Sequence, residues 1–422
     1  MNIVHIGSHD NTGGAARAAF RLHTGLKSAG CQSSMVVGWK RETGDEIDSV
    51  VPVGSMRQKI SSRLFIKIDK LLSLQHLYSP WSRTFLRHPF VRSADVINLH
   101  NLNGGYISHR ILPRLGQIAP IVWTFHGMWG MTGHCSFAYD CQRWKTGCGR
   151  CPDLSDDPAL TFDTTALLWR IKRRVYESTQ MTVVTPSKWL SGLASESPLV
   201  GQFDIHTIPN GLDLDTFKPV PQSAARRTLG LPEDAKVIMF AAHQLFDRRK
   251  GGAYLLDALR QLGQSGQEKI WLLTVGSGTL DPERETIPFP VQNLGHISSD
   301  HILAACYSAA DVLVAPSLAE SFGQVFSESM ACGTPCVAFD TTAVSEVVRH
   351  METGYLAPLG DADGLAQGIQ LLLENDELRA RMAAKCRRVA EDEYSITLQT
   401  RRYMEVYEEV ASRRKSLAGK DV

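Results

Sequence analysis

Short apolar runs alternate with amphipathic segments twice along this chain of 422 residues, and this repetition limits its fold more than any other feature. In the first half, strands are predicted at 3–6, 34–38, 95–99, 121–125 and 181–185, with a helix over 15–27. In the second half, strands are predicted at 237–242, 270–275, 312–315 and 336–339, separated by helices over 253–262, 301–309 and 324–330. This order is typical of parallel sheets covered by helices, so the sequence predicts an α/β protein with two doubly wound, Rossmann-like domains.

The turn sequence Pro209-Asn210-Gly211 and the irregular stretch that follows it indicate the boundary between the halves. We place an N-terminal domain at 1–207 and a C-terminal domain at 208–399. The segment from 364 to 413 has helical periodicity throughout, and a helix at about 400–416 is expected to pack back on the first domain. Because ligands of open parallel sheets bind at the carboxyl ends of the strands, a central cleft between the domains is the expected site.

Composition excludes several classes of protein. The chain is 43% hydrophobic and 21% charged, as in soluble globular proteins, and its formal charge of +1 gives no indication of nucleic-acid binding. The N-terminal residues lack the basic flank and apolar core of a signal peptide, and no run approaches the ~18 apolar residues of a membrane span. We therefore expect a cytoplasmic protein.

Familiar nucleotide-binding fingerprints are missing. Gly13-Gly14 follows the first strand and opens a helix, which suits close approach of a phosphate, although a tight turn explains the pair equally well. Gly276 and Gly278 also follow a strand, but no third glycine completes a dinucleotide fingerprint, and no P-loop sequence occurs. The sequence therefore disfavours nicotinamide-dependent and P-loop enzymes.

The densest signal is the stretch from Ala315 to Val337, APSLAESFGQVFSESMACGTPCV. It places Glu320 in a loop after a strand and Glu328 about two turns into the next helix. Two carboxylates at this spacing, with exposed backbone N–H groups between them, could hold the hydroxyls of one elongated polyol ligand.

This stretch closely resembles the donor-site signature of the large family 4 type of retaining GT-B glycosyltransferases, which includes bacterial enzymes of polysaccharide assembly. Further pieces of the chain match that family in the same order: Gly13-Gly14, 124–127, 184–187, 208–213, 249–252, 294–297, 307–312 and 354–356. The resemblance implies a GT-B fold and a metal-independent, retaining transfer of a hexosyl unit. The donor would be a UDP- or GDP-sugar and the acceptor a saccharide or lipid-linked oligosaccharide.

The resemblance also implies roles for individual residues. Glu328 would hold the ribose hydroxyls of the donor, and Glu320 would face the hexose. The expected donor-binding residues are Gly13, Gly14, Arg248, Arg249, Lys250, His296, Ile297, Glu320, Ser321, Phe322, Gly323 and Glu328. Lys250 and an arginine would hold the diphosphate, whose growing negative charge must be met by fixed cations where no metal is used. The family's usual arginine position is occupied by Leu245, so Arg248 or Arg249 must take its place.

Two histidines end neighbouring strands of the first half. The resemblance implies that His126 contacts the donor sugar, for example at its 6-hydroxyl, and joins Glu320 and Lys250 as a catalytic residue. His100 follows the preceding strand and is expected on the acceptor side by the same geometry. A purely structural histidine is the common alternative at such positions.

Four of the nine cysteines, Cys135, Cys141, Cys148 and Cys151, lie within seventeen positions. Four thiols could bind a structural Zn²⁺ in a tetrahedral site, with His134 as a spare ligand. The spacing is not that of a standard zinc finger, so reduced thiols and a disulfide pair remain alternative interpretations. The family's chemistry requires no cofactor.

A basic amphipathic segment precedes His100. Eight lysines and arginines lie between Arg57 and Arg92 with one acid, Asp69, and they alternate with leucine, isoleucine and aromatic residues. Such a segment suits peripheral contact with the anionic inner face of the cell membrane, and a helix pair with a solvated basic face is the alternative.

The sequence thus predicts a glycosyltransferase of bacterial surface polysaccharide biosynthesis, including exopolysaccharide or O-antigen. Two alternatives remain open. One is another GT-B sugar-nucleotide chemistry, such as an epimerase or a phosphorylase. The other is a non-catalytic sugar-nucleotide-binding subunit of a polysaccharide complex, which the intact Glu320, Glu328 and Lys250 disfavour.

Overall fold

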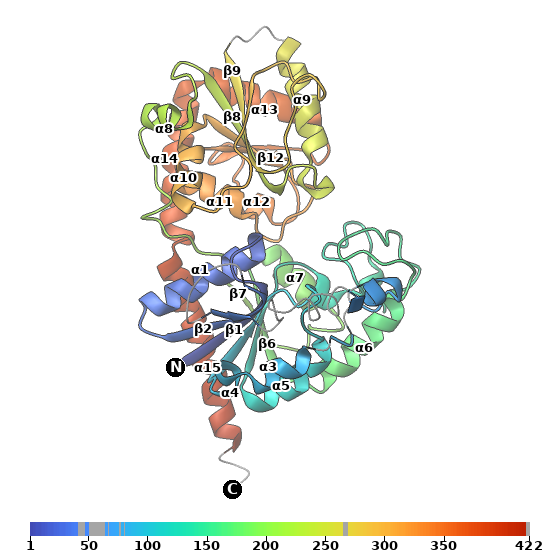
Figure 1. Cartoon of the computed structure of the whole chain (residues 1–422). Helices are drawn as coiled ribbons and strands as arrows, with labels where there is room; N and C mark the ends of the chain where they lie inside the picture. Colours follow the sequence, from blue (N-terminus) through green and yellow to red (C-terminus); the bar gives the residue numbers. More distant parts are fainter. Residues whose placement is uncertain are drawn as a thin grey trace. The chain divides into compact units, whose positions relative to one another are not determined.

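A computed structural model describes residues 1–40, 47–49, 64–65, 67–75, 77–79, 81–264 and 269–418 of the chain (Figure 1). Within these ranges the chain forms two compact units. Unit 1 comprises Met1–Pro209 together with Gln399–Val422, and unit 2 comprises Asn210–Leu398. Each unit contains one parallel sheet, which confirms the α/β fold class of two doubly wound domains.

Unit 1 is built on a seven-stranded parallel sheet with the order β3-β2-β1-β4-β5-β6-β7. Its strands are β1 (Asn2–His9), β2 (Gln32–Trp39), β3 (Ile47–Ser49), β4 (Val96–Leu99), β5 (Ile121–Thr124), β6 (Met181–Thr185) and β7 (Ile205–Thr207). Its helices are α1 (Gly14–Ser28), α3 (Ser82–Arg87), α4 (Pro89–Arg92), α5 (Leu112–Ile118), α6 (Thr165–Glu177), α7 (Lys188–Glu196) and α15 (Ile396–Ala418). The order changes direction at β1, where the chain crosses to β4, and ligand sites of such sheets lie at this kind of switch point.

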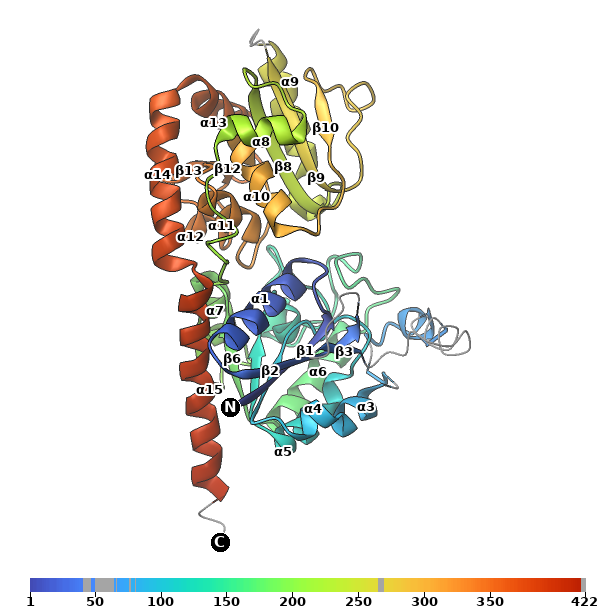
Figure 2. The ribbon, with the colours of Figure 1, turned by 60° about the vertical axis from the view of Figure 1, so that its left-hand side comes forward.

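Helices cover both faces of this sheet. One face packs against residues of α5, α6 and α7, including Leu115, Trp169 and Leu190. The other face packs against α1 and α15, and both views show these two helices on the same side of the sheet (Figures 1 and 2). The central strands therefore begin with apolar side chains that face both sides of the sheet, as parallel strands covered on both faces require.

Hydrogen bonds tie α15 to the middle of the sheet. Asn98 on β4 donates to the hydroxyl of Tyr407 at 2.6 Å, and the hydroxyls of Thr124 on β5 and Tyr403 lie 3.1 Å apart. Thr124 also donates to the side-chain oxygen of Asn98 at 3.0 Å, which joins the two strands. All four side chains are buried, so the polar groups of this seam satisfy one another.

Unit 2 contains a six-stranded parallel sheet with the order β10-β9-β8-β11-β12-β13, whose outer strand β10 is visible in Figure 2. Its strands are β8 (Lys236–Gln244), β9 (Ile270–Ser277), β10 (Val291–Asn293), β11 (Val312–Val314), β12 (Cys336–Phe339) and β13 (Gly354–Ala357). Its helices are α8 (Gln222–Leu229), α9 (Gly252–Gln264), α10 (Asp300–Ala309), α11 (Gln324–Ala331), α12 (Val344–Val347), α13 (Ala362–Glu374) and α14 (Asp376–Glu393). Both faces of this sheet are covered by buried apolar side chains.

The prediction of unbroken helix from 364 to 413 is wrong at two points. Asn375 separates α13 from α14, and its side chain caps α14 by accepting from the backbone N–H of Leu378. Ser395 separates α14 from α15 and accepts in the same way from Leu398. Short polar side chains of this type compete with helical hydrogen bonds and begin new helices, which the apolar periodicity alone does not reveal.

The short strands β3, β7, β10 and β13 were absent from the sequence prediction. β7, β10 and β13 are only partly buried, unlike the equally short but fully buried β4, β5, β11 and β12, which were predicted. None of the helices in the described part of the chain combines the length and apolarity needed to cross a bilayer.

Replacing Tyr407 with Phe tests the seam. The substitution leaves the buried amide of Asn98 without its acceptor and should lower the free energy of unfolding of unit 1 by about 1–3 kcal/mol. Urea unfolding followed by tryptophan fluorescence reports on this unit, since seven of the eight tryptophans belong to it. Tyr78→Phe, at a tyrosine that is 62% exposed, is the matched control. Equal midpoints for both variants would contradict the prediction.

Candidate active site

An ion cluster lies at the carboxyl-terminal edge of the sheet of unit 2. Glu320 follows β11, and its carboxylate lies 2.5 Å from Nζ of Lys250 and 3.2 Å from Nη1 of Arg249. Both cations belong to a short 3₁₀ turn, Arg248–Lys250, that follows β8. Parallel pairing of β8 and β11 places the two loops side by side. The structure thus brings together two of the three predicted catalytic residues.

Backbone contacts fix this arrangement. The N–H of Leu318 donates to the carbonyl of Arg249 at 2.8 Å, and Nη1 of Arg249 donates to the carbonyl of Ala319 at 3.0 Å. Gly251 adopts a φ of +69°, and a Cβ at this position would lie 1.8 Å from the carbonyl oxygen of Pro316. The loop that carries Lys250 can therefore approach the loop of Glu320 only with glycine at this position.

Electrostatics keep Glu320 ionised. Its side chain is only 8% exposed, and this burial opposes ionisation of the carboxyl. The charges of Lys250 and Arg249 outweigh burial and hold the pKa of Glu320 at about 2. A second carboxylate, that of Asp247, lies 3.6 Å from Arg249, so the two cations of the cluster face two acids in the ligand-free protein.

The structure separates the two candidate arginines. Arg248 is exposed, whereas Arg249 is partly buried against Glu320. Leu245, at the position where the family usually carries arginine, is 1% exposed in the apolar core. Arg249 therefore accompanies Lys250, and Arg248 does not take part in the ion cluster.

Glu328 occupies the second turn of α11 and is 3% exposed. Its Oε2 accepts a hydrogen bond of 2.9 Å from the hydroxyl of Tyr307, the buried tyrosine of α10. Tyr307 belongs to the matching segment 307–312, but nothing in the sequence assigns it a role. The buried carboxylate required a partner, but no local pattern identifies which of the ten tyrosines provides it.

The loop between the two glutamates turns sharply into α11. Gly323 has a φ of +83°, and a Cβ there would lie 2.5 Å from the ring of Phe326. Ser321 and Phe322 precede it, and Phe322 is buried against Tyr394. His296 and Ile297 follow β10 at the same edge, where the exposed ring of His296 contacts that of His243 with centroids 5.7 Å apart.

The remaining predicted site residues belong to unit 1. Gly13 and Gly14 connect β1 to α1, and Gly13 adopts a φ of +87° as the residue before the helix. Nothing lies within 4 Å of a Cβ built at Gly13, so the strained φ, and not crowding, accounts for glycine at this position.

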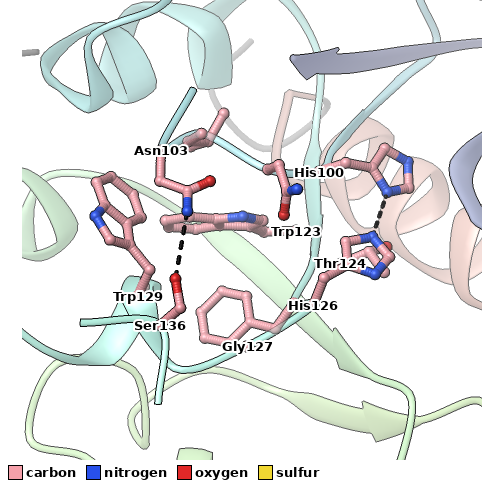
Figure 3. A pocket seen from close by; sticks show the side chains of 12 residues that line it. His100, Asn103, Trp123, Thr124, His126, Gly127, Trp129 and Ser136 are labelled. Carbon is pink, nitrogen blue, oxygen red and sulfur yellow. Dashed lines mark hydrogen bonds between the residues drawn. The ribbon is translucent and has the colours of Figure 1, made fainter. Parts of the chain in front are cut away.

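A small pocket opens where β4 and β5 end (Figure 3). It is lined by His100, Asn101, Leu102, Asn103, Trp123, Thr124, Phe125, His126, Gly127, Trp129, Gly130 and Ser136. Asn103 donates to the hydroxyl of Ser136 at 3.5 Å on one side of the pocket, and the ring nitrogens of His100 and His126 lie 3.0 Å apart on the other. Burial lowers the pKa of His126 to about 4 and that of His100 well below its usual value, so both rings are neutral at pH 7.

The zinc hypothesis for Cys135, Cys141, Cys148 and Cys151 is not supported. No three His, Cys, Asp or Glu side chains within the described ranges gather as metal ligands would. The thiols have other partners: Cys148 accepts from the N–H of Gly133, and Cys151 contacts His134 and donates to the carbonyl of Asp153. Burial raises the pKa of Cys135 to about 12 and that of Cys148 to about 11, which favours neutral thiols.

Comparison with known families assigns both halves of the chain. Residues 12–216 match the model described as Glycosyltransferase Family 4, and residues 221–389 match the model described as Glycosyl transferases group 1. Phosphatidyl-myo-inositol mannosyltransferase of Mycobacterium leprae is 37% identical over 213 residues, which are 50% of this chain and 54% of that protein. The matched segment thus spans about half the length of this relative. The putative colanic acid biosynthesis glycosyl transferase WcaC of Escherichia coli is 24% identical over 365 residues, covering 83% of this chain and 85% of WcaC.

Solved structures agree on the fold. Sucrose-phosphate synthase from Thermosynechococcus elongatus superposes with a TM-score of 0.68 at 20% identity, covering 98% of this chain and 100% of that one. Anabaena Alr3699/HepE, in complex with UDP and glucose, superposes with a TM-score of 0.67 at 18% identity, covering 97% and 99%. Together with the two family matches, these similarities show that the chain belongs to the family 4 type of GT-B glycosyltransferases.

Proposed function

We propose that this protein transfers a hexosyl unit from a nucleoside-diphosphate sugar to a hydroxyl of a saccharide or lipid-linked acceptor, with retention of anomeric configuration, in bacterial surface polysaccharide assembly. The observation that carries the proposal is the cluster of Lys250, Arg249 and Glu320 at the carboxyl-terminal edge of the sheet of unit 2. The donor class is supported by the structures of HepE, which are complexes with UDP and with UDP-glucose.

The charges of the cluster suit departure of a nucleoside diphosphate. Breaking the glycosidic bond of the donor leaves negative charge on the phosphate oxygen, and two preorganised cations stabilise it without reorganisation. In the ligand-free protein Glu320 holds both cations in place. On donor binding the diphosphate takes over contacts to Lys250 and Arg249, and Glu320 is then available to the hydroxyls of the hexose.

The other predicted residues complete this scheme. Glu328, oriented by Tyr307, accepts hydrogen bonds from the ribose hydroxyls. His126 contacts the hexose, and His100 lies beside it at the pocket of unit 1. The departing phosphate oxygen accepts the proton of the acceptor hydroxyl on the same face of the sugar, so the configuration is retained and no metal ion is needed.

Substitutions in the cluster test the assignment. Lys250→Ala and Glu320→Ala should each lower kcat for transfer at least about 100-fold, because the loss of a preorganised charge partner costs roughly this factor. Arg249→Ala should have a larger effect than Arg248→Ala, since only Arg249 contacts Glu320. The measurement is formation of glycosylated acceptor from a panel of UDP- and GDP-sugars, with circular dichroism to verify folding.

The control is Arg260→Ala, which removes a partly exposed arginine of α9 that pairs with Asp257 and donates to the carbonyl of Glu285. It should retain wild-type turnover. Full activity of the folded Lys250 and Glu320 variants would refute the proposal. Donor isomerisation without transfer would instead indicate an epimerase, phosphate-dependent cleavage a phosphorylase, and donor binding without turnover a non-catalytic subunit.

The charge state of Glu320 predicts a pH dependence of stability. Its pKa in the folded protein, about 2, lies below the ordinary 4.5, so its ionisation stabilises the fold above about pH 4.5, and this contribution is lost as the pH falls toward 2. Glu320→Gln should therefore be less stable than wild type by up to about 3 kcal/mol at pH 7, with a smaller difference at pH 3–4. Calorimetry at several pH values measures this, with the exposed Glu283→Gln as control. A difference that does not change with pH would contradict the assigned ion pairs.

Peripheral contact with an anionic membrane is the second part of the proposal. Residues 64–65 and 67–71 are helical, and Leu64, Ile68, Leu71 and Leu72 repeat at helical spacing with exposed fractions of 46–65%. Lys67 and Lys70 are exposed between them. The predicted residues Arg57, Lys59, Arg63 and Ile66 lie outside the described part of the chain. An exposed apolar face flanked by lysines matches the requirements of binding at a lipid headgroup surface.

Cosedimentation with vesicles tests this contact. The protein should bind vesicles of phosphatidylglycerol at low salt and dissociate as salt screens the lysines. The double variant Ile68→Ser/Leu71→Ser should reduce binding, while Tyr139→Ser, at an exposed tyrosine elsewhere in unit 1, should not. Absence of binding at low salt, or equal binding to uncharged vesicles, would remove this part of the proposal.

A further inference from the structure

Three imidazoles form a continuous hydrogen-bonded chain in unit 1. Nδ1 of His5 lies 3.1 Å from Nε2 of His100, and Nδ1 of His100 lies 3.0 Å from Nε2 of His126. The rings are nearly parallel, with centroids 5.3 Å apart in both pairs. His5 is on β1, and His100 and His126 follow β4 and β5, so the chain crosses three neighbouring strands and ends at the pocket shown in Figure 3.

The alternation of side chains along the strands explains why the three histidines lie in line. Side chains alternate between the two faces of a strand, so His5, His100 and His126 all lie on the face covered by α1 and α15. His5 and His100 are 0% and 2% exposed, whereas His126 is partly exposed. The chain thus leads from the interior of unit 1 to a ligand-accessible ring.

A neutral imidazole carries one proton, so each ring can donate through one nitrogen only while the other accepts. The histidine chain therefore has two self-consistent arrangements of its protons. In one, every ring donates toward His126. In the other, every ring donates toward His5, and the last proton resides on Nε2 of His5.

The environment of His5, at the inner end of the histidine chain, distinguishes these two arrangements. Nε2 of His5 is buried and has no hydrogen-bond partner among the described residues. A proton on this nitrogen would be a buried donor without an acceptor, and such donors are rarer in folded proteins than under-used acceptors. The proton of His5 therefore belongs on Nδ1, and the first arrangement follows: His5 donates to His100, and His100 donates to Nε2 of His126.

We propose that His5 and His100 are positioning residues that hold His126 as its Nδ1–H tautomer. With Nε2 of His126 engaged as an acceptor, the ring meets a ligand at the pocket as a hydrogen-bond donor and not as a base. That the ligand is a sugar hydroxyl rests on the function proposed above, whereas the tautomer itself does not depend on that function.

The surroundings of the three histidines keep their rings neutral. The titratable group facing His5 from α1 is His23, whose ring meets that of His5 edge to face and whose Nδ1 lies 2.8 Å from the hydroxyl of Ser33. Burial, and to a smaller extent the neighbouring histidines, lowers the pKa of His5 and His100 well below its usual value. The tautomers therefore persist across neutral pH, which would not hold if a ring of the chain were protonated.

Nitrogen NMR on the full chain tests the tautomer without an activity assay. In protein labelled with ¹⁵N only at histidine, long-range ¹H–¹⁵N correlations report which ring nitrogen carries the proton. We assign His126 and His100 by the signals that His126→Gln and His100→Gln remove. The expected result at pH 7 is a proton on Nδ1 of both rings. A proton on Nε2 of His126, or a His126 charged at pH 7, would overturn the proposal.

Two variants of His5 separate positioning from packing. His5→Leu removes the first donor, so His126 should become a mixture of tautomers, and kcat should fall roughly tenfold, as for the loss of a residue that orients a functional group. Donor KM should change less than about twofold. His5→Asn keeps a donor near Nδ1 and should restore the Nδ1–H signal of His126 and most of kcat.

His206→Leu is the matched control, because it removes a partly buried histidine of β7 outside the chain. It should leave the signal of His126 and the kinetics unchanged. An unchanged His126 tautomer in folded His5→Leu would refute the role of His5. If the wild-type protein transfers no sugar, the proposed function fails, while the NMR result still decides the tautomer.

Discussion

Parallel strand pairing is the constraint on which both units depend. Every strand pairing in the described part of the two sheets is parallel, so the loops that follow the strands all begin at the same edge. Lys250, Glu320 and Thr342 follow β8, β11 and β12 in this way, and the hydroxyl of Thr342 accepts from the N–H of Glu320 at 2.9 Å. Residues separated by about ninety positions in sequence are thereby gathered at one edge of the sheet.

The two units meet the cost of buried polar groups differently. Unit 2 places a nearly buried carboxylate between two cations, so its candidate site is charged before any ligand arrives. Unit 1 places neutral rings in a row, in which each ring is hydrogen-bonded to its neighbour. The first arrangement suits a polyanionic ligand such as a diphosphate, and the second suits an uncharged ligand rich in hydroxyl groups. A sugar nucleotide contains both kinds of chemical group.

The sequence predicted the parts of this structure that repeat or that lie close together in the chain. The long buried strands and the helices between them were evident from apolar periodicity, and Glu320 and Glu328 stood within one recognisable stretch. The edge strand β10 was missed because it is only partly buried and its sequence, Val291-Gln292-Asn293, contains no continuous apolar run. The division between α14 and α15 was missed because it depends on the cap at Ser395 and not on the apolar pattern.

Contacts between distant residues account for what the sequence did not reveal about the site. His5 and His100 are 95 residues apart, and Tyr307 reaches Glu328 from another helix, so no local spacing pairs them. The choice between Arg248 and Arg249 likewise depends on which side chain turns toward β11. Once the register of β1 against β4 places His5 opposite Asn98, however, His100 must lie one step further along the same face. The histidine chain is thus a consequence of strand register, and a shift of β4 by one residue would turn His100 to the opposite face of the sheet and break it.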